Sequence, residues 1–175
     1  MLRKVLVTSL FVLSLAAAAG AQTKVNFAGQ CAKPDLMNAI PIADRPNHAY
    51  AISQAKCTYT KSAEIGGAKA TSAVGWTTDE IRGDSDRFHG YFEETWSNGD
   101  KILYTYEGKG TLKAGAFQGA DETWSVIRGT GAHKGVKGKG TCKVTGNADG
   151  TVTFDCEGEL QHPAPKPATP AKKAK

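Results

Sequence analysis

From His48 to Leu160 the chain alternates apolar and polar residues along short runs that are rich in Val, Ile, Thr and aromatic side chains. Glycine, Asn-Gly and Asp-Gly interrupt these runs, as expected for strands joined by tight turns. No window keeps the apolar period of 3.6 residues that indicates an amphipathic helix. The pattern therefore predicts an all-β protein with few helices.

We expect seven long strands in this region, over residues 48–65, 69–81, 87–97, 101–110, 120–128, 136–145 and 151–160, and residues 22–29 can form a short one. Short connections favour an antiparallel up-and-down β-barrel of about eight strands, because closure leaves no unpaired edge. The segment 31–47 contains three prolines and is expected to be a loop with one helical turn around 36–40. Of the 20 glycines, 15 lie between Gly83 and Gly158, and we assign them to strand ends and tight turns.

One hairpin, over residues 88–106, can be predicted in detail around the turn sequence at 98–99. A two-residue Asn-Gly turn would mix apolar and polar residues on both faces. One additional bulge residue pairs Trp96 with Ile102 and collects the aromatic residues on one face, so we prefer this register. It sets Glu94 among aromatic side chains on the inner face, where burial raises the pKa of a carboxyl group unless the group is paired.

This inner face is the candidate ligand site. A cavity there would bind a small apolar or aromatic molecule, with Glu94 as its polar handle. Two alternatives remain open: Glu94 is the general acid or base of a cyclase or isomerase, or it pairs with an arginine or a tyrosine hydroxyl and fills the barrel, leaving an envelope interaction module. Catalytic residues are not assigned, and the candidate ligand-binding residues are Phe92, Glu94, Trp96, Tyr104, Tyr106 and Trp124.

The first 21 residues have the pattern of a cleaved export signal, with two early basic residues, an apolar run and the small residues Ala19-Gly20-Ala21. The apolar run is too short to span a bilayer as a permanent helix. We expect a signal peptide at 1–21, one barrel domain at 22–162 and a disordered tail rich in Pro, Ala and Lys at 163–175. The protein is then periplasmic or secreted and has no membrane span.

All four cysteines follow the signal, in a compartment where disulfides persist. Cys142 and Cys156 lie symmetrically about Asp149 in a turn sequence, so strands folded back there place them opposite each other. Cys31 then remains to pair with Cys57. The spacings CxxC and HxxxH are absent from the sequence, so we expect disulfides and no metal.

The net charge of +5 belongs to the ends of the chain. Two of the 22 basic residues lie in the signal and four in the tail, which leaves 16 basic against 17 acidic residues between them. The domain therefore lacks the basic surface of a nucleic-acid binder. The glycines from Gly129 onward have the spacing GxGxxxG with no helix pattern after them, which argues against a nucleotide cofactor. His133 and His162 are expected at the surface.

The segment Gly129-Thr-Gly-Ala-His-Lys-Gly-Val-Lys-Gly138 resembles the Gly-Thr-Gly-x-aromatic-x-x-(Ala/Val)-x-Gly ribbon of the allene oxide cyclase and dirigent superfamily, which includes small exported bacterial members of unknown role. The resemblance implies an eight-stranded antiparallel barrel with an apolar cavity. It covers about ten residues, and His133 stands where an aromatic residue is usual. The catalytic residues of cyclases and dirigents cannot be mapped onto this chain, so the resemblance supports the fold rather than an activity.

Overall fold

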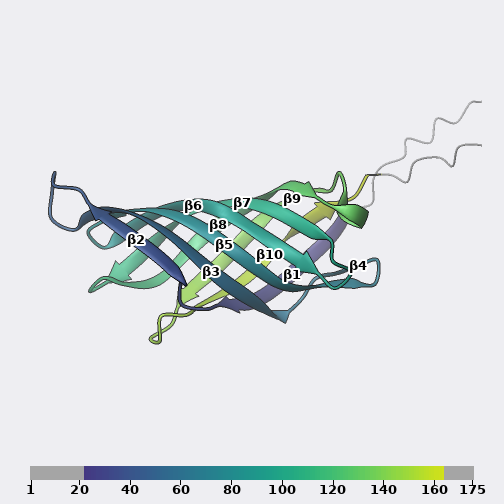
Figure 1. The fold of residues 1–175 in the computed structure, drawn as a ribbon, viewed down its shortest axis with the longest axis horizontal. Coiled ribbons are helices and arrows are strands. Elements are labelled where there is room, and N and C mark those ends of the chain that lie inside the picture. Colours follow the sequence, from purple (N-terminus) through teal and green to yellow (C-terminus); the bar gives the residue numbers. More distant parts are fainter. Residues whose placement is uncertain (1–21, 164–175) are drawn as a thin grey trace, which may run out of the picture.

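The computed structural model describes residues 22–163, which form a closed antiparallel barrel (Figure 1). Eight strands make the wall in the order β1, β3, β5, β6, β7, β8, β9, β10, and β10 pairs with β1 to close it. Two short strands lie outside this ring, β2 beside β3 and β4 beside β5. The predicted all-β class and eight-stranded barrel are confirmed, whereas the expected signal and nearly all of the expected tail lie outside the described residues.

The seven long strands predicted from the sequence are all present, with ends shifted by up to four residues. Between residues 22 and 163, no helix is long and apolar enough to cross a membrane. The elements are β1 (Gln22–Cys31), β2 (Leu36–Pro41), β3 (His48–Lys61), β4 (Glu64–Ile65), β5 (Ala68–Arg82), β6 (Ser85–Trp96), β7 (Lys101–Lys113), β8 (Ala116–Gly129), the 3₁₀ turn η1 (Gly131–His133), β9 (Lys137–Gly146) and β10 (Val152–Gln161).

Residues 36–40 belong to a strand, so the helical turn predicted there is wrong. Leu36 pairs with Gln54 and Pro41 with Ala49, in an antiparallel ladder along the first half of β3. On that edge β1 pairs only with residues 57–61 of β3. Without β2, the backbone N–H and C=O groups along this edge of β3 would have no partners. Pairing them with β2 stabilises the fold more than a helical turn at 36–40 would.

The β6–β7 hairpin keeps the predicted inner face but not the predicted register. Ile102 pairs with Glu94, whereas the sequence predicted that it would pair with Trp96, two residues farther along β6. The backbone N–H of Trp96 donates to the carbonyl of Asp100 at 2.9 Å, and Gly99 adopts a φ of 84°. A three-residue loop with a left-handed glycine produces this pairing. Because the shift is two residues, every side chain stays on its predicted face.

Both predicted disulfides are present, and both lie inside the barrel. Cys142 of β9 stands directly opposite its partner Cys156 of β10. Cys31 and Cys57 join β1 to β3, where these strands pair over only a few residues. Two disulfides fit an oxidising compartment outside the cytoplasm.

Glycines within the strands make room for aromatic rings. A β-carbon added to Gly108 would collide with the ring of Phe88, and one added to Gly140 would collide with the ring of Trp124. The assignment of these glycines to turns and strand ends is wrong. They lie inside β7 and β9, where the absence of a side chain lets a ring from the neighbouring strand lie against the backbone.

The interior is filled more tightly at one end than at the other. We call the end that carries the β6–β7 turn, β4 and η1 the plugged end (Figure 1). Its inward side chains Trp96, Ile102 and Leu160 are at most 2% exposed. Toward the opposite end, which carries the β5–β6 and β7–β8 turns, inward side chains such as Asp79 and Val144 are partly exposed. We call that the acidic end, for the carboxyl groups described below.

Replacing Gly140 by alanine should destabilise the barrel. The new methyl group must displace the Trp124 ring and the backbone of β10, and overpacking of this kind costs about 1–3 kcal/mol. Gly75→Ala is the matched control, because its β-carbon would meet Phe92 at an ordinary 3.5 Å. Urea unfolding of the disulfide-bonded protein measures both. Equal effects of the two variants would contradict the packing argument.

Candidate functional site

Glu94 lies on the inner face with its carboxylate enclosed, only 1% of the residue being exposed. One carboxylate oxygen accepts a hydrogen bond from the Tyr59 hydroxyl at 2.7 Å. The other accepts from the Tyr104 hydroxyl at 2.7 Å and from the Trp96 indole N–H at 3.0 Å. Burial raises the pKa of Glu94, and the three donors oppose this rise. The carboxylate is thus solvated by protein groups in place of water.

The six predicted site residues all face the interior, and the five aromatic ones belong to one core. Tyr104 packs edge-on against Trp124, with ring centres 5.5 Å apart. Phe92 and Tyr106 are partly exposed, whereas the other members of the set are buried. Tyr104 pairs with Phe92 and Trp124 with Tyr106, so position along the strands does not distinguish these residues. Their partial exposure makes Phe92 and Tyr106 the members of the set that face the less densely filled part of the barrel.

Three further inward carboxyl groups lie toward the acidic end, and the sequence analysis did not single them out. They are Asp79 of β5, Asp86 of β6 and Glu122 of β8. Asp86 is 5% exposed, and its Oδ1 is buried without a hydrogen-bond partner. Within residues 22–163, none of the three takes part in an ion pair. Strand alternation could have identified two of these groups from the sequence. Asp86 lies two residues before Phe88, and Glu122 two residues before Trp124, so each carboxyl group points to the same face as its aromatic neighbour.

Burial raises the pKa of all three groups. The pKa of Asp79 rises to about 7, with repulsion from Asp86 as a second cause. That of Asp86 rises to about 6, and that of Glu122 to about 8. Burial also raises the pKa of Tyr106, and the charges of Glu122 and Asp79 raise it further, which places this tyrosine near both. Perturbed carboxyl groups of this kind are typical of functional sites.

The Tyr106 hydroxyl of β7 is held in place by β5, which lies beyond β6 in the wall. It lies 2.6 Å from the Thr77 hydroxyl and donates to the backbone carbonyl of Trp76 at 3.2 Å. Its ring occupies the space where Gly90 lacks a side chain. The Tyr106 ring is thereby fixed against the wall, next to the acidic groups.

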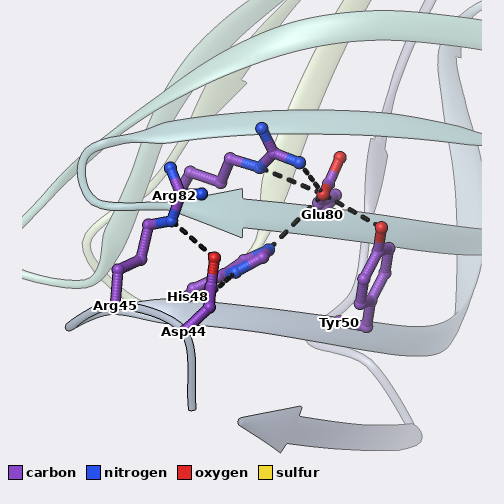
Figure 2. A network of polar contacts seen from close by, with 6 residues as sticks. All are labelled: Asp44, Arg45, His48, Tyr50, Glu80 and Arg82. Atoms are coloured by element: carbon purple, nitrogen blue, oxygen red, sulfur yellow. Dashed lines mark hydrogen bonds and ion pairs between the residues drawn. The ribbon is translucent and has the colours of Figure 1, made fainter. Parts of the chain in front are cut away.

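A second polar network lies at the acidic end on the outer side of the wall (Figure 2). The ring of His48 contacts Asp44 through Nδ1 and Glu80 through Nε2, and Arg82 also binds Glu80. The hydrogen bond from His48 is the main cause that lowers the pKa of Asp44 to about 2. The network ties the connection 42–47 to β3 and β5, and we assign it to structure.

The structure also describes a hollow of about 1440 Å³ that is bordered by residues of all eight wall strands, among them the inward Asp79, Phe88 and Glu122. Across residues 22–163, no cluster of three or more His, Cys, Asp or Glu side chains could hold a metal ion. The inward carboxyl groups are therefore the chemically distinctive feature of the interior.

His133 closes the plugged end, so its prediction as a surface residue is wrong. The turn η1 folds it inward until it is 1% exposed, with its ring centre 4.4 Å from that of Trp96. Its Nδ1 lies 3.3 Å from Nε2 of His162, which is partly exposed, and its own Nε2 has no partner. Burial lowers the pKa of His133, and His162 lowers it further. His133 thus packs as an uncharged ring against Trp96.

The chain matches no protein-family model and no curated protein. Two solved structures are similar along most of its length, those of the pterocarpan synthase dirigent proteins GePTS1 and PsPTS1. Each has a TM-score of 0.51 and 14% sequence identity, and the matches cover 89% and 82% of this chain and 97% of each of those chains. The chain shares their barrel fold. At this identity the likeness concerns the fold and assigns no role to a residue.

Glu122→Gln should stabilise the protein in alkaline solution. Because the folded-state pKa is raised from 4.5 to about 8, the folded state holds a proton that the unfolded state loses, and stability falls as the pH rises through this window. One pKa unit corresponds to about 1.4 kcal/mol, so part of the shift gives a gain on the order of 2 kcal/mol at pH 8. Thermal unfolding at pH 4 and pH 8 measures it, with the exposed Glu107→Gln as control. Equal gains at the two pH values would contradict the burial of an uncompensated carboxyl group.

His133→Phe should remove a loss of stability in mild acid. A lowered histidine pKa means that the unfolded state binds the proton first, so the wild type loses stability as the pH falls below 6.5. The phenylalanine variant keeps the stacked ring and has nothing to protonate. We expect a flatter dependence of its melting temperature between pH 7 and pH 5, and an unchanged slope for the exposed His89→Gln. If the melting temperatures of His133→Phe and the wild type fall equally with pH, the buried His133 does not cause the loss of stability in acid.

Proposed function

We propose that this barrel binds a small apolar or aromatic molecule in its interior, in the periplasm or outside the cell. The observation that carries the proposal is the set of inward carboxyl groups without ion-pair partners at the less densely filled end of an aromatic interior. An apolar wall with a few polar groups is typical of small-molecule sites. Buried carboxyl groups without partners destabilise a fold, and a ligand that donates hydrogen bonds would offset this cost.

In this proposal Phe92 and Tyr106 contact the apolar part of the ligand, and Asp79 and Glu122 accept its hydrogen bonds. The hydrogen bonds to Glu94 favour its alternative role as an internal acceptor. It then holds Tyr59, Trp96 and Tyr104 in place, and Tyr104 packs against Trp124. The floor of the site is formed by Trp96, Tyr104 and Trp124.

The fold comparison supports the general class of this proposal. The two similar structures are named as dirigent proteins and pterocarpan synthases. A shared barrel is consistent with a role in binding or directing a small molecule, and the identity of that molecule must come from the residues of this chain.

Binding of 2-naphthol tests the site, because it combines an aromatic body with one hydroxyl donor. Loss of a hydrogen bond to a charged group costs about 1.5–3 kcal/mol, so Glu122→Gln or Asp79→Asn should weaken binding about 10- to 100-fold near pH 8. Fluorescence titration of the full-length exported protein measures the affinity.

The matched control ligand is naphthalene, which lacks the hydroxyl group and should bind both variants as well as it binds the wild type. The matched control variant is the outward Glu107→Gln, which should leave naphthol binding unchanged. No saturable binding of either compound would reject the interior site and favour a filled barrel that acts through its outer surface.

A second function is favoured by one observation, the pKa of about 7 for Asp79. A carboxyl group that titrates near neutral pH is suited to general acid–base catalysis, as a cyclase or isomerase requires. Native mass spectrometry of protein purified from its own compartment would identify a co-purifying ligand as the substrate candidate. An enzyme would convert that compound, and Asp79→Asn would abolish turnover while the compound still binds. A binding protein would leave it unchanged.

A further inference from the structure

Six of the eight exposed large hydrophobic side chains in residues 22–163 lie on one outer face of the barrel, over β2, β3, β5 and β6. Ile40 of β2 pairs with Tyr50 of β3, and Trp76 of β5 pairs with Tyr91 of β6, so these side chains share the outward face. Figure 1 shows β2 lying along β3 on the near side of the wall. We call this set the apolar face, and its members are Leu36, Ile40, Tyr50, Ile52, Trp76 and Tyr91.

The apolar face is large for a surface that stays in contact with water. Its members are between 37% and 66% exposed. Side chains of this kind present about 150–250 Å² each, so the six together expose on the order of 600 Å². That is at the upper limit of about 300–600 Å² for the largest patch on a typical monomer, and it approaches the ~800 Å² that each partner buries in a standard interface.

The charge pattern of the face suits contact with an identical surface. Leu36, Gln54, Trp76 and Tyr91 form one row across the four strands, and Asn38, Ile52, Thr78 and His89 form the next. Neither row contains Asp, Glu, Lys or Arg. The third row holds Ile40, Tyr50, Glu80 and the exposed Arg87, and Glu80 is already paired with Arg82 and accepts a hydrogen bond from Tyr50. Packing the two uncharged rows on themselves therefore opposes no like charges, whereas a charged partner would find nothing to pair with in those rows.

We propose that the apolar face is the contact through which two copies of this chain associate. An interface formed by the same patch on both copies is self-complementary about a two-fold axis, the commonest arrangement of soluble oligomers. The two sheets then pack face to face, with Ile52 and Trp76 near the centre and the Glu80–Arg82 pair at the rim. The proposal is independent of the interior ligand.

The mass of the full-length exported protein in solution tests this contact. Sedimentation velocity at micromolar concentration should give twice the mass of one chain for the wild type. Ile52→Asp and Tyr91→Asp each place a carboxylate in the apolar contact on both copies, and should weaken association by about 100-fold or more. The matched control is Ile127→Asp, which alters an exposed apolar residue of β8 outside the face.

Dilution of the wild type provides a second readout. Trp96 and Trp124 are buried, whereas Trp76 is partly exposed, so dilution of a wild-type dimer should shift the tryptophan emission to longer wavelength. Trp76→Phe should abolish that shift. Far-ultraviolet circular dichroism establishes that the aspartate variants are folded. A wild type with the mass of one chain at every concentration would overturn the proposal. So would an assembly that both aspartate variants leave intact, which would indicate another surface such as the free edge of β2.

Discussion

The structure depends on how aromatic rings share a narrow interior. An eight-stranded barrel encloses a space that side chains can just fill. Here the backbone beneath several rings carries no side chain, as at Gly140 and Gly158 beneath Trp124 and at Gly90 beneath Tyr106. Each glycine lets a ring lie against the wall instead of standing across the barrel. This arrangement fits large side chains into one closed sheet and leaves the acidic end less densely filled than the plugged end.

The carboxyl groups of this interior lie in two opposite environments, one rich in hydrogen-bond donors and one poor in them. Glu94 is surrounded by three hydrogen-bond donors, and this replaces the water that it loses on burial. Asp86 has a buried oxygen with no partner, and its charge repels that of Asp79 beside it and raises the pKa of Asp79. A full set of donors offsets the cost of burying a carboxylate, whereas neighbouring carboxyl groups without cations cost stability. This difference is why we place the ligand at the acidic end and give Glu94 a structural role.

The sequence was sufficient to predict features that depend on local alternation. The strands, the pairing of Cys142 with Cys156 and the inner position of Glu94 all follow from the two-residue period and from turn residues between strands. Features that depend on distant partners were missed. The strand β2 forms because β3 leaves an edge unpaired, and His133 is buried because η1 folds over Trp96. The hairpin register was missed for a local reason, since a three-residue and a longer loop place the same residues on the same face.

The two proposed sites lie on opposite sides of the same strands. Along β5, Trp76 and Thr78 point outward into the apolar face, while Thr77 and Asp79 point inward. The Tyr106 hydroxyl, which lies inside, donates to the backbone carbonyl of Trp76, whose side chain lies outside. A second copy packed against Trp76 would restrain the strand that carries this acceptor and Asp79. Association on the outer face would then fix the geometry of the interior site without contacting the ligand, because a strand held on one face has less freedom to move on the other.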